Sequence, residues 1–245
     1  MNTKMQRAFA AVVLLGAAPA AFADEAAVRR MIQQRFGGAE RIESVQKVPW
    51  GGLYEVVVSS ADGPQIFYVD EAASVFIAGR VIDAKTGRNL TEERERQLTA
   101  IAWDKLPWQW AITSKRGNGR RKIAILSDPN CPYCKRLEED LAKLDDLTTH
   151  IFPYAVIKPE SVRQAKSVWC SKDRAKAWND LMFRRIEPQG PTDCANPIED
   201  VIKFGRTIGA RSTPTWFLET GERYSGAMPL EKVRALLDAA SQGKR

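Results

Sequence analysis

Residues 127–140 read SDPNCPYCKRLEED, and this stretch decides the fold. Its two cysteines, Cys131 and Cys134, are separated by two residues. The apolar residues 123–126 before it predict a buried strand, and residues 132–144 after it predict a helix with proline in its first turn. A Cys-x-x-Cys pair at such a junction can be a metal clamp, a structural disulfide or a redox pair.

The strand-to-helix junction favours the redox pair. It places Cys131 at the N-terminus of the helix, where unpaired backbone N–H groups and the helix dipole stabilise a negative charge. A thiolate with a lowered pKa is a nucleophile near neutral pH and a good leaving group. Cys134 lies one helical turn further on, so the two sulfurs can meet. We predict that Cys131 attacks disulfides and that Cys134 resolves the mixed disulfide.

A metal site and a hydrolase site are the weaker alternatives. A structural zinc site needs four ligands, usually two cysteine pairs or added histidines. The chain has one histidine, His150, and its other two cysteines, Cys170 and Cys194, form no second close pair. His150 lies in a strand-like run, which also disfavours a Cys–His hydrolase. We predict no metal and no cofactor.

The remaining cysteines, Cys170 and Cys194, have the pattern of a structural disulfide. Closing a loop of about 25 residues would stabilise the fold by about 3 kcal/mol. Four cysteines allow three connectivities, and the sequence favours Cys131–Cys134 with Cys170–Cys194 without excluding the others. Free thiols or a regulatory role remain the alternatives for the second pair.

Residues 1–23 predict a cleaved secretory signal of the bacterial type. Lys4 and Arg7 precede an apolar run, and Ala-Phe-Ala at 21–23 is a small-x-small cleavage site. An uncleaved membrane anchor is the alternative, but the run is short, and no later segment reaches about 18 consecutive apolar residues. Export leads to an oxidising compartment, where disulfide chemistry is expected.

The composition is that of an ordinary globular protein. The 245 residues, with 44% hydrophobic and 27% charged residues, suggest one or two domains with a sizeable core. The net charge of +7 falls to +5 when cleavage removes Lys4 and Arg7. The densest basic cluster, residues 115–122, has a Gly-Asn-Gly centre that predicts a solvated hairpin turn. No nucleic-acid module accompanies it, so we predict no nucleic-acid partner.

The residues before the cysteine pair predict a small module of one helix and a sheet. A helix over residues 25–36 precedes short strand-like runs with polar turns, at residues 41–49, 53–60, 65–70, 75–79 and 80–90. About sixty residues make a thin core, so this module is expected to associate with a second copy. Residues 91–103 then predict a charged linker helix with Thr91 as its N-cap.

The second half of the chain alternates strands and helices. This order predicts an α/β layer fold with a helical insertion. The predicted strands are 110–114, 122–126, 151–157, 215–219 and 222–225, the last two forming a hairpin around Gly221. The predicted helices are 132–144, 161–185, 197–208 and 230–240.

A second motif carries a resemblance to a known fold. Together with CPYC, the segment STPT at residues 212–215 resembles the cis-proline loop of a thioredoxin-type domain. The resemblance implies that the Thr213–Pro214 bond is cis and lies beside the cysteines. It also implies that Pro214 keeps the loop open next to Cys131, and that the Thr213 backbone pairs with an extended substrate. Tyr133 is the third expected substrate-binding residue.

The whole chain resembles the bacterial periplasmic disulfide isomerases of the DsbC and DsbG group. The shared motifs are D-x-x-C-x-Y-C from Asp128 to Cys134, WCSKD at 169–173, and Thr213–Pro214. The resemblance implies an α+β protein, in which a small cystatin-like α+β dimerisation domain and a linker helix precede a thioredoxin-like α/β catalytic domain with a helical insertion. The implied limits are 1–23 for the signal peptide, 24–90 for the dimerisation domain, 91–108 for the linker helix and 109–245 for the catalytic domain.

The resemblance also implies partners. In this family the N-terminal domains pair into a homodimer, and the redox sites face an uncharged cleft. The implied substrates are misfolded disulfide-containing proteins in the periplasm, and the implied electron donor is a DsbD-like membrane thiol reductase. The chain itself is expected not to insert into the membrane. Cys170 and Cys194 resemble the second cysteine pair of DsbC.

The dipeptide between the active-site cysteines leaves two enzymatic functions open. DsbC-type enzymes typically carry Gly-Tyr there, whereas Pro132-Tyr133 resembles DsbG and glutaredoxins. The predicted function is a thiol–disulfide isomerase that reshuffles incorrect disulfides. The alternative enzyme is a periplasmic sulfenic-acid reductase or redox chaperone of the DsbG type. A dimeric holdase that binds unfolded chains is the alternative from a different class.

Overall fold

The structure is a computed structural model that describes residues 25–37, 41–60 and 63–243. The chain divides into two compact units, and their main boundary falls between Ala78 and Gly79. Both parts combine helices with a sheet, so the predicted α+β class is confirmed. The predicted signal peptide, residues 1–23, lies outside the described residues.

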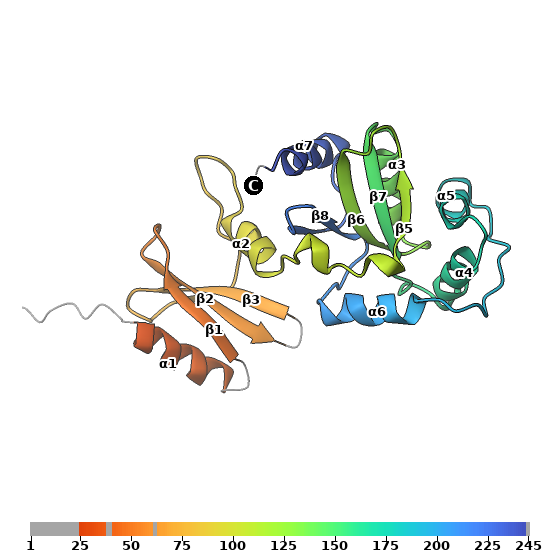
Figure 1. Ribbon diagram of the computed structural model, residues 1–245. Helices are drawn as coiled ribbons and strands as arrows, with labels where there is room; N and C mark the ends of the chain where they lie inside the picture. The colour runs from red at the N-terminus through yellow and green to blue at the C-terminus, as the bar shows by residue number, and fades with distance from the viewer. Residues whose placement is uncertain (1–24, 38–40, 61–62, 244–245) are drawn as a thin grey trace, which may run out of the picture. The chain divides into compact units, whose positions relative to one another are not determined.

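A helix and a four-stranded sheet form the N-terminal part of the chain (Figure 1). Val28 and Ile32, one turn apart on the helix, are buried, and the helix packs against the first strand. The rings of Phe36 and Phe76 both pack against Phe67 at a tilt, with centroids 5.3 and 4.8 Å away. The elements are α1 (Glu25–Phe36), β1 (Arg41–Lys47), β2 (Leu53–Ser60), β3 (Gly63–Asp70) and β4 (Phe76–Ile77), with sheet order β1-β2-β3-β4.

The prediction of strands over residues 75–90 is only partly confirmed, because β4 is the one strand that forms there among the described residues. After it, Asp83 Oδ1 accepts hydrogen bonds from the backbone N–H groups of Lys85 and Thr86, at 2.9 and 3.0 Å. A carboxylate on a short side chain that accepts hydrogen bonds from nearby backbone N–H groups competes with strand pairing for those groups. Where the sequence predicts a strand over residues 80–90, the described residues form a single β-bridge, between Ile82 and Asn89.

The helix after this loop is shorter than the predicted 91–103, and its N-cap is Asn89 rather than Thr91. Asn89 Oδ1 accepts a hydrogen bond from Glu92 N at 3.0 Å. The Thr91 hydroxyl instead accepts one from Val81 N at 2.9 Å, which makes it a partner of the preceding loop. The elements here are α2 (Leu90–Leu98) and two 3₁₀ turns, η1 (Trp103–Lys105) and η2 (Trp108–Trp110).

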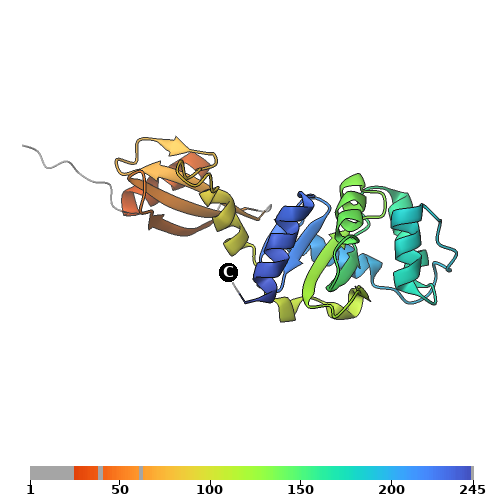
Figure 2. The same cartoon turned by 90° about the horizontal axis from the view of Figure 1, so that it is seen from above.

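A five-stranded sheet forms the centre of the C-terminal unit (Figures 1 and 2). Its order is β5-β7-β6-β8-β9, with β6 and β7 parallel and the other pairs antiparallel. The strands are β5 (Ile112–Lys115), β6 (Arg121–Ser127), β7 (Leu147–Pro153), β8 (Thr215–Leu218) and β9 (Arg223–Ser225). The helices are α3 (Pro132–Leu141), α4 (Pro159–Trp169), α5 (Arg174–Arg184), α6 (Ile198–Thr207) and α7 (Leu230–Ser241).

Helices cover both faces of this sheet. α7 packs on β6 and β8 and touches α3, whereas α6 packs on β7 and lies on the other side in Figure 1. β6 is therefore buried on both faces, and its residues 123–126 are fully inaccessible to solvent. This explains why the strand reads as a continuous apolar run rather than as alternation. Both views place α4 and α5 together at the opposite end of the unit from α7.

The Gly-Asn-Gly turn is not a hairpin. β5 and β6 are not neighbours in the sheet, because each pairs with β7. The turn is still tight, with φ of +54° at Gly117 and +68° at Gly119. Asp146, just before β7, accepts a hydrogen bond from Asn118 N at 2.9 Å and so ties the turn to that strand.

The predicted long helix over residues 161–185 is interrupted. α4 ends at Trp169, with Cys170 as its C-cap, and α5 begins after Asp173. The Asp173 side chain accepts a hydrogen bond from Lys176 N at 2.9 Å, which caps the second helix. The predicted hairpin around Gly221 is confirmed by the antiparallel pairing of β8 with β9.

Candidate active site

The cysteine pair lies where the central strand turns into a helix. β6 ends at Ser127, and Cys131 N–H donates to the Asp128 carbonyl at 3.1 Å as the chain turns. Cys131 is the N-cap of α3, and Pro132 occupies the first turn. Both cysteines are free thiols, with Cys131 3% exposed and Cys134 fully buried. The local geometry is the one that the sequence predicts.

Asp128 fixes the loops on either side of this junction. Its buried carboxylate accepts hydrogen bonds from Asn130 N at 2.7 Å, Val156 N at 2.7 Å and Ile157 N at 2.8 Å. It also accepts one from Ser161 Oγ at 2.8 Å, in the first turn of α4. One side chain thus joins the start of α3 to the loop between β7 and α4. Its contacts explain why this position belongs to the motif.

The loop before β8 forms the other side of the site. β8 pairs with β6 so that Thr215 faces Leu126, which brings the start of β8 to the edge where β6 ends. The Thr213–Pro214 peptide bond is cis, as the resemblance implied. The Cys131 thiol donates a hydrogen bond to the Thr213 carbonyl at 3.3 Å. Two segments that are far apart in the sequence therefore meet at this sulfur.

The two thiols have pKa values shifted in opposite directions. A hydrogen bond from the Cys134 thiol is the largest cause that lowers the pKa of Cys131, to about 5. Burial opposes this shift, while the Thr213 side chain and the backbone N–H groups of Cys134 and Tyr133 add to it. Burial, followed by the hydrogen bond to Cys131, raises the pKa of Cys134. One thiol is therefore a thiolate at neutral pH, and its neighbour keeps its proton.

Apolar side chains are exposed around the buried sulfurs. Tyr133, between the two cysteines, is 61% exposed, and Val156 and Ile157 on the loop held by Asp128 are 40% and 50% exposed. Thr213, in contrast, is buried, and its backbone carbonyl is the atom that reaches Cys131. The arrangement offers an apolar surface beside a reactive sulfur.

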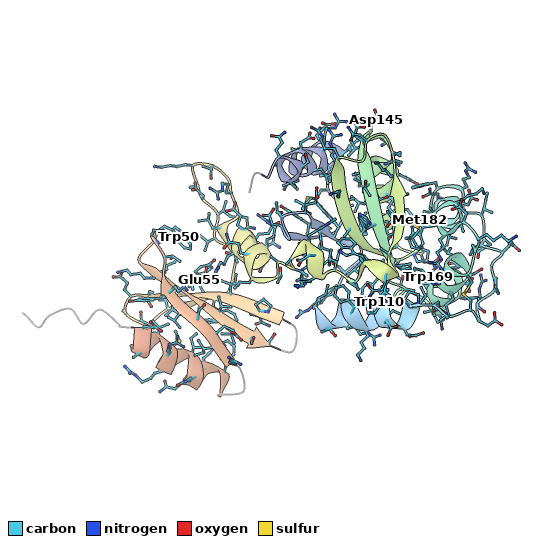
Figure 3. All side chains as sticks on the ribbon, viewed as in Figure 1. Trp50, Glu55, Trp110, Asp145, Trp169 and Met182 are labelled. Atoms are coloured by element: carbon cyan, nitrogen blue, oxygen red, sulfur yellow. A yellow bond between two sulfur atoms is a disulfide. The ribbon has the colours of Figure 1, made fainter. Side chains whose placement is uncertain are left out.

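Cys170 and Cys194 are joined by a disulfide bond, with their Cα atoms 5.9 Å apart. The bond ties the end of α4 to the loop before α6, which is the closed insertion that the sequence predicts. Trp169, labelled in Figure 3, is buried beside Cys170, and the Arg174 guanidinium stacks on its ring at 3.9 Å. The disulfide lies in the helical insertion, and the redox pair lies at the β6–α3 junction.

The sequence interpretation missed one buried carboxyl next to the pair. Glu138 is 5% exposed on α3, where Ser127 Oγ donates to it at 2.5 Å and Trp178 Nε1 at 2.7 Å. Burial raises the pKa of Glu138 to about 7. Helical periodicity could have found it, because Cys134, Glu138 and Leu141 fall on one buried stripe of α3.

The described residues contain no group of three or more His, Cys, Asp and Glu side chains placed to hold a metal ion. Across the same residues, every helix is too short or too polar to span a bilayer.

The one histidine of the sequence, His150, lies against aromatic side chains. Its ring packs against Trp108 at 4.8 Å, and burial lowers the pKa of His150 to about 4.

Comparison with known proteins places the geometry in a family. A family model described as the disulfide bond isomerase protein N-terminal domain matches residues 19–92, and one described as a thioredoxin-like domain matches residues 108–241. A probable thiol:disulfide interchange protein DsbC of Bordetella parapertussis is 37% identical over 212 residues, covering 86% of this chain and 73% of the relative. The chain belongs to the DsbC family.

More distant members and a solved structure extend the similarity. The thiol:disulfide interchange protein DsbC of Escherichia coli K12 is 25% identical over 242 residues, which is 96% of each chain. The crystal structure of a disulfide interchange protein from Neisseria gonorrhoeae is 36% identical with a TM-score of 0.53, and covers 56% of this chain and 99% of that one. The chain is thus a thiol–disulfide oxidoreductase of the DsbC family with a thioredoxin-like domain.

Proposed function

We propose that the chain is a thiol–disulfide isomerase that reshuffles incorrect disulfides in periplasmic proteins, with Cys131 as nucleophile and Cys134 as resolving thiol. The observation that carries this proposal is the opposite shift of the two thiol pKa values at a helix N-terminus beside the Thr213 carbonyl. Only a thiolate attacks a disulfide, and a thiolate with a lowered pKa is also a good leaving group.

The reaction begins when the Cys131 thiolate attacks one sulfur of a substrate disulfide. The substrate S–S bond breaks, a substrate thiolate leaves, and a mixed disulfide forms. In isomerisation, another substrate thiolate attacks the mixed disulfide, forms a new substrate disulfide and releases Cys131, so no net electrons are consumed. In reduction, Cys134 loses its proton and attacks Cys131, which leaves a Cys131–Cys134 disulfide and a reduced substrate.

Substrate binding is assigned to Tyr133, Thr213 and Pro214. The exposed Tyr133 ring offers apolar contact next to the reacting sulfur. The Thr213 backbone can pair with an extended segment, a mode of recognition that reads little sequence and so accepts many misfolded chains. Cys170–Cys194 is assigned a structural role, because it closes the helical insertion and lies outside the β6–α3 junction.

The proposal also includes the compartment, the domain division and the partners of the enzyme. Residues 1–23 direct export to the periplasm, residues 24–90 form the homodimerisation domain, 91–108 the linker helix and 109–245 the catalytic domain. The two family matches support this division. A DsbD-like membrane thiol reductase keeps the cysteine pair reduced, because isomerisation starts from the Cys131 thiolate. Misfolded disulfide-containing proteins are the substrates.

The test is recovery of activity from a scrambled multi-disulfide protein in a glutathione buffer. The wild-type protein should restore activity, and Cys131→Ser should not. A second candidate, a DsbG-type sulfenic-acid reductase, is favoured by the Pro132-Tyr133 dipeptide. It predicts that the wild-type protein fails with the scrambled substrate, yet still reduces insulin and a protein sulfenic acid.

A further inference from the structure

A buried carboxyl lies one helical turn beyond the resolving cysteine and has no part in the reaction described above. Glu138 shares the inward stripe of α3 with Cys134, Leu137 and Leu141. Carboxylates are rarely buried to this degree unless they are paired or hydrogen-bonded. Among the described residues, the hydrogen bonds that reach the Glu138 carboxylate come from Ser127 and Trp178, neither of which carries a charge.

Ser127 connects this carboxyl to the Cys134 sulfur. The Ser127 hydroxyl donates to Glu138 Oε1 at 2.5 Å, and the next backbone N–H, that of Asp128, donates to Cys134 Sγ at 3.5 Å. The Ser127 side chain is also one of the causes that lower the pKa of the Cys134 thiol, against the larger effect of burial. Trp178 Nε1 donates to the other carboxylate oxygen at 2.7 Å and fixes its orientation. A hydroxyl that can both accept and donate a proton therefore stands between a thiol and a carboxylate.

The electrostatics of Glu138 suit a base that works near neutral pH. Burial raises the pKa of Glu138 to about 7, against the hydrogen bonds of Ser127 and Trp178, and the nearby Cys131 charge raises it further. A base is most effective when its pKa is close to the working pH. Among the described residues, the titratable or charged groups that face it are Cys131, Cys134 and Arg116, whose guanidinium donates to the Leu141 carbonyl.

A small polar cavity adjoins the carboxyl on its other side. It has a volume of about 20 Å³, which is enough for one water molecule. Its polar lining consists of Glu138 on α3, Ser114 on β5, Thr149 on β7, Asn179 on α5, and Arg116 in the turn after β5. The cavity therefore has room for one water molecule next to the Glu138 carboxyl.

Resting on the proposed function, we propose that Glu138 is the proton acceptor that activates Cys134, with the Ser127 hydroxyl as the relay. The Cys134 thiol proton passes to Ser127 Oγ while the Ser127 proton passes to Glu138. The Cys134 thiolate then attacks Cys131, the Cys131–substrate bond breaks, and the substrate leaves as a thiolate. When a reductant thiolate later opens the Cys131–Cys134 disulfide, Cys134 leaves as a thiolate and takes the proton back from Glu138.

The test follows the two thiols separately in the reduced full-length protein. The aromatic disulfide reagent DTNB releases one coloured thiolate when Cys131 attacks it, and a second when Cys134 resolves the mixed disulfide. Stopped-flow absorbance across a pH series therefore gives one rate constant for each cysteine. Glu138→Gln keeps the size of the side chain and its ability to hydrogen-bond, and Glu139→Gln, at an exposed position one residue along the same helix, is the matched control.

We expect Glu138→Gln to leave the first phase unchanged and to slow the second phase on the order of 10²-fold near neutral pH. The defect should shrink at alkaline pH, where hydroxide removes the proton, and the inflection near pH 7 should disappear. Ser127→Ala should slow the same phase, which keeps the test decisive if Glu138→Gln fails to fold. Glu139→Gln should match the wild type.

The outcomes separate the two proposals. A second phase with the wild-type rate and pH profile in both relay variants would overturn the role of Glu138. Equal slowing of both phases would overturn it too, because it would show a general structural effect. A wild-type protein with no first phase would instead contradict the assignment of Cys131 as nucleophile, and hence the proposed function.

Discussion

At the scale of single residues, the site depends on a contrast between two identical side chains. Cys131 and Cys134 are one helical turn apart, yet one is a thiolate and the other keeps its proton. The helix N-terminus explains the direction of the first shift, because its backbone N–H groups face the Cys131 sulfur. The largest cause, however, is the hydrogen bond from Cys134. The two thiols therefore act as a coupled pair.

This coupling predicts the effect of Cys134→Ala. Removing the main hydrogen-bond donor should raise the pKa of Cys131 from about 5 towards its ordinary value. The pH dependence of alkylation by iodoacetamide measures this pKa, because only the thiolate reacts. In the wild type, reactivity should be half-maximal near pH 5, and in the variant at clearly higher pH. An unchanged midpoint would show that the helix terminus alone sets the Cys131 pKa.

At the scale of elements, the sequence predicts best what local residues determine. β6 and α3 follow from an apolar run and from a proline after Cys131, and both form as expected. The β5–β6 connection could not be predicted, because both strands pair with β7, which comes later in the chain. Asp173 caps α5 and so divides the helix predicted over residues 161–185, and Asn89 replaces the predicted Thr91 as the cap of α2.

The residues of the active site also divide into those that the sequence predicts and one that depends on the fold. The cysteine pair is visible in the sequence because its spacing and position have a chemical meaning, and the Thr213–Pro214 loop is visible through a resemblance. Glu138 is harder to recognise, because a charged residue among other charged residues usually lies on a solvated face, and only its spacing from Cys134 and Leu141 indicates the buried face of α3. Its burial depends on Trp178, which reaches it from α5 across the fold.

Removing the disulfide in the helical insertion should lower the stability of the fold without changing the reactivity of Cys131. Replacing both Cys170 and Cys194 with Ala should lower the free energy of unfolding by about 3 kcal/mol, because the unfolded chain regains the freedom of a closed loop. Urea denaturation measures this change, and the DTNB first phase should keep its rate. A slowed first phase in a folded variant would show that the insertion also shapes the redox site.

At the scale of the whole molecule, the N-terminal part is what distinguishes this chain from a single thioredoxin-like domain. Simple dithiol oxidation needs only the cysteine pair and its thioredoxin-like domain, whereas reshuffling requires holding a substrate while its cysteines exchange. The proposed homodimer provides that through two sites on one assembly. The match of residues 19–92 to the disulfide bond isomerase N-terminal domain supports this assignment.

Deletion of residues 24–90 should therefore change the balance of activities. We expect the shortened protein to be monomeric by light scattering, to recover scrambled substrate poorly, and to gain in dithiol oxidation. Circular dichroism of the fragment provides the control for folding. If the fragment is folded and monomeric but isomerises as well as the full chain, the role of dimerisation in isomerisation is contradicted.

The most direct measurement for the central claim is to trap the mixed disulfide. Cys134→Ala removes the resolving thiol, so the complex with a scrambled multi-disulfide protein should accumulate, and mass spectrometry of its peptides identifies the bonded cysteine. The account predicts a single attachment, at Cys131. Attachment at Cys170 or Cys194, or no accumulation while Cys131 remains a reactive thiolate, would contradict the assignment of Cys131 as the attacking and Cys134 as the resolving cysteine.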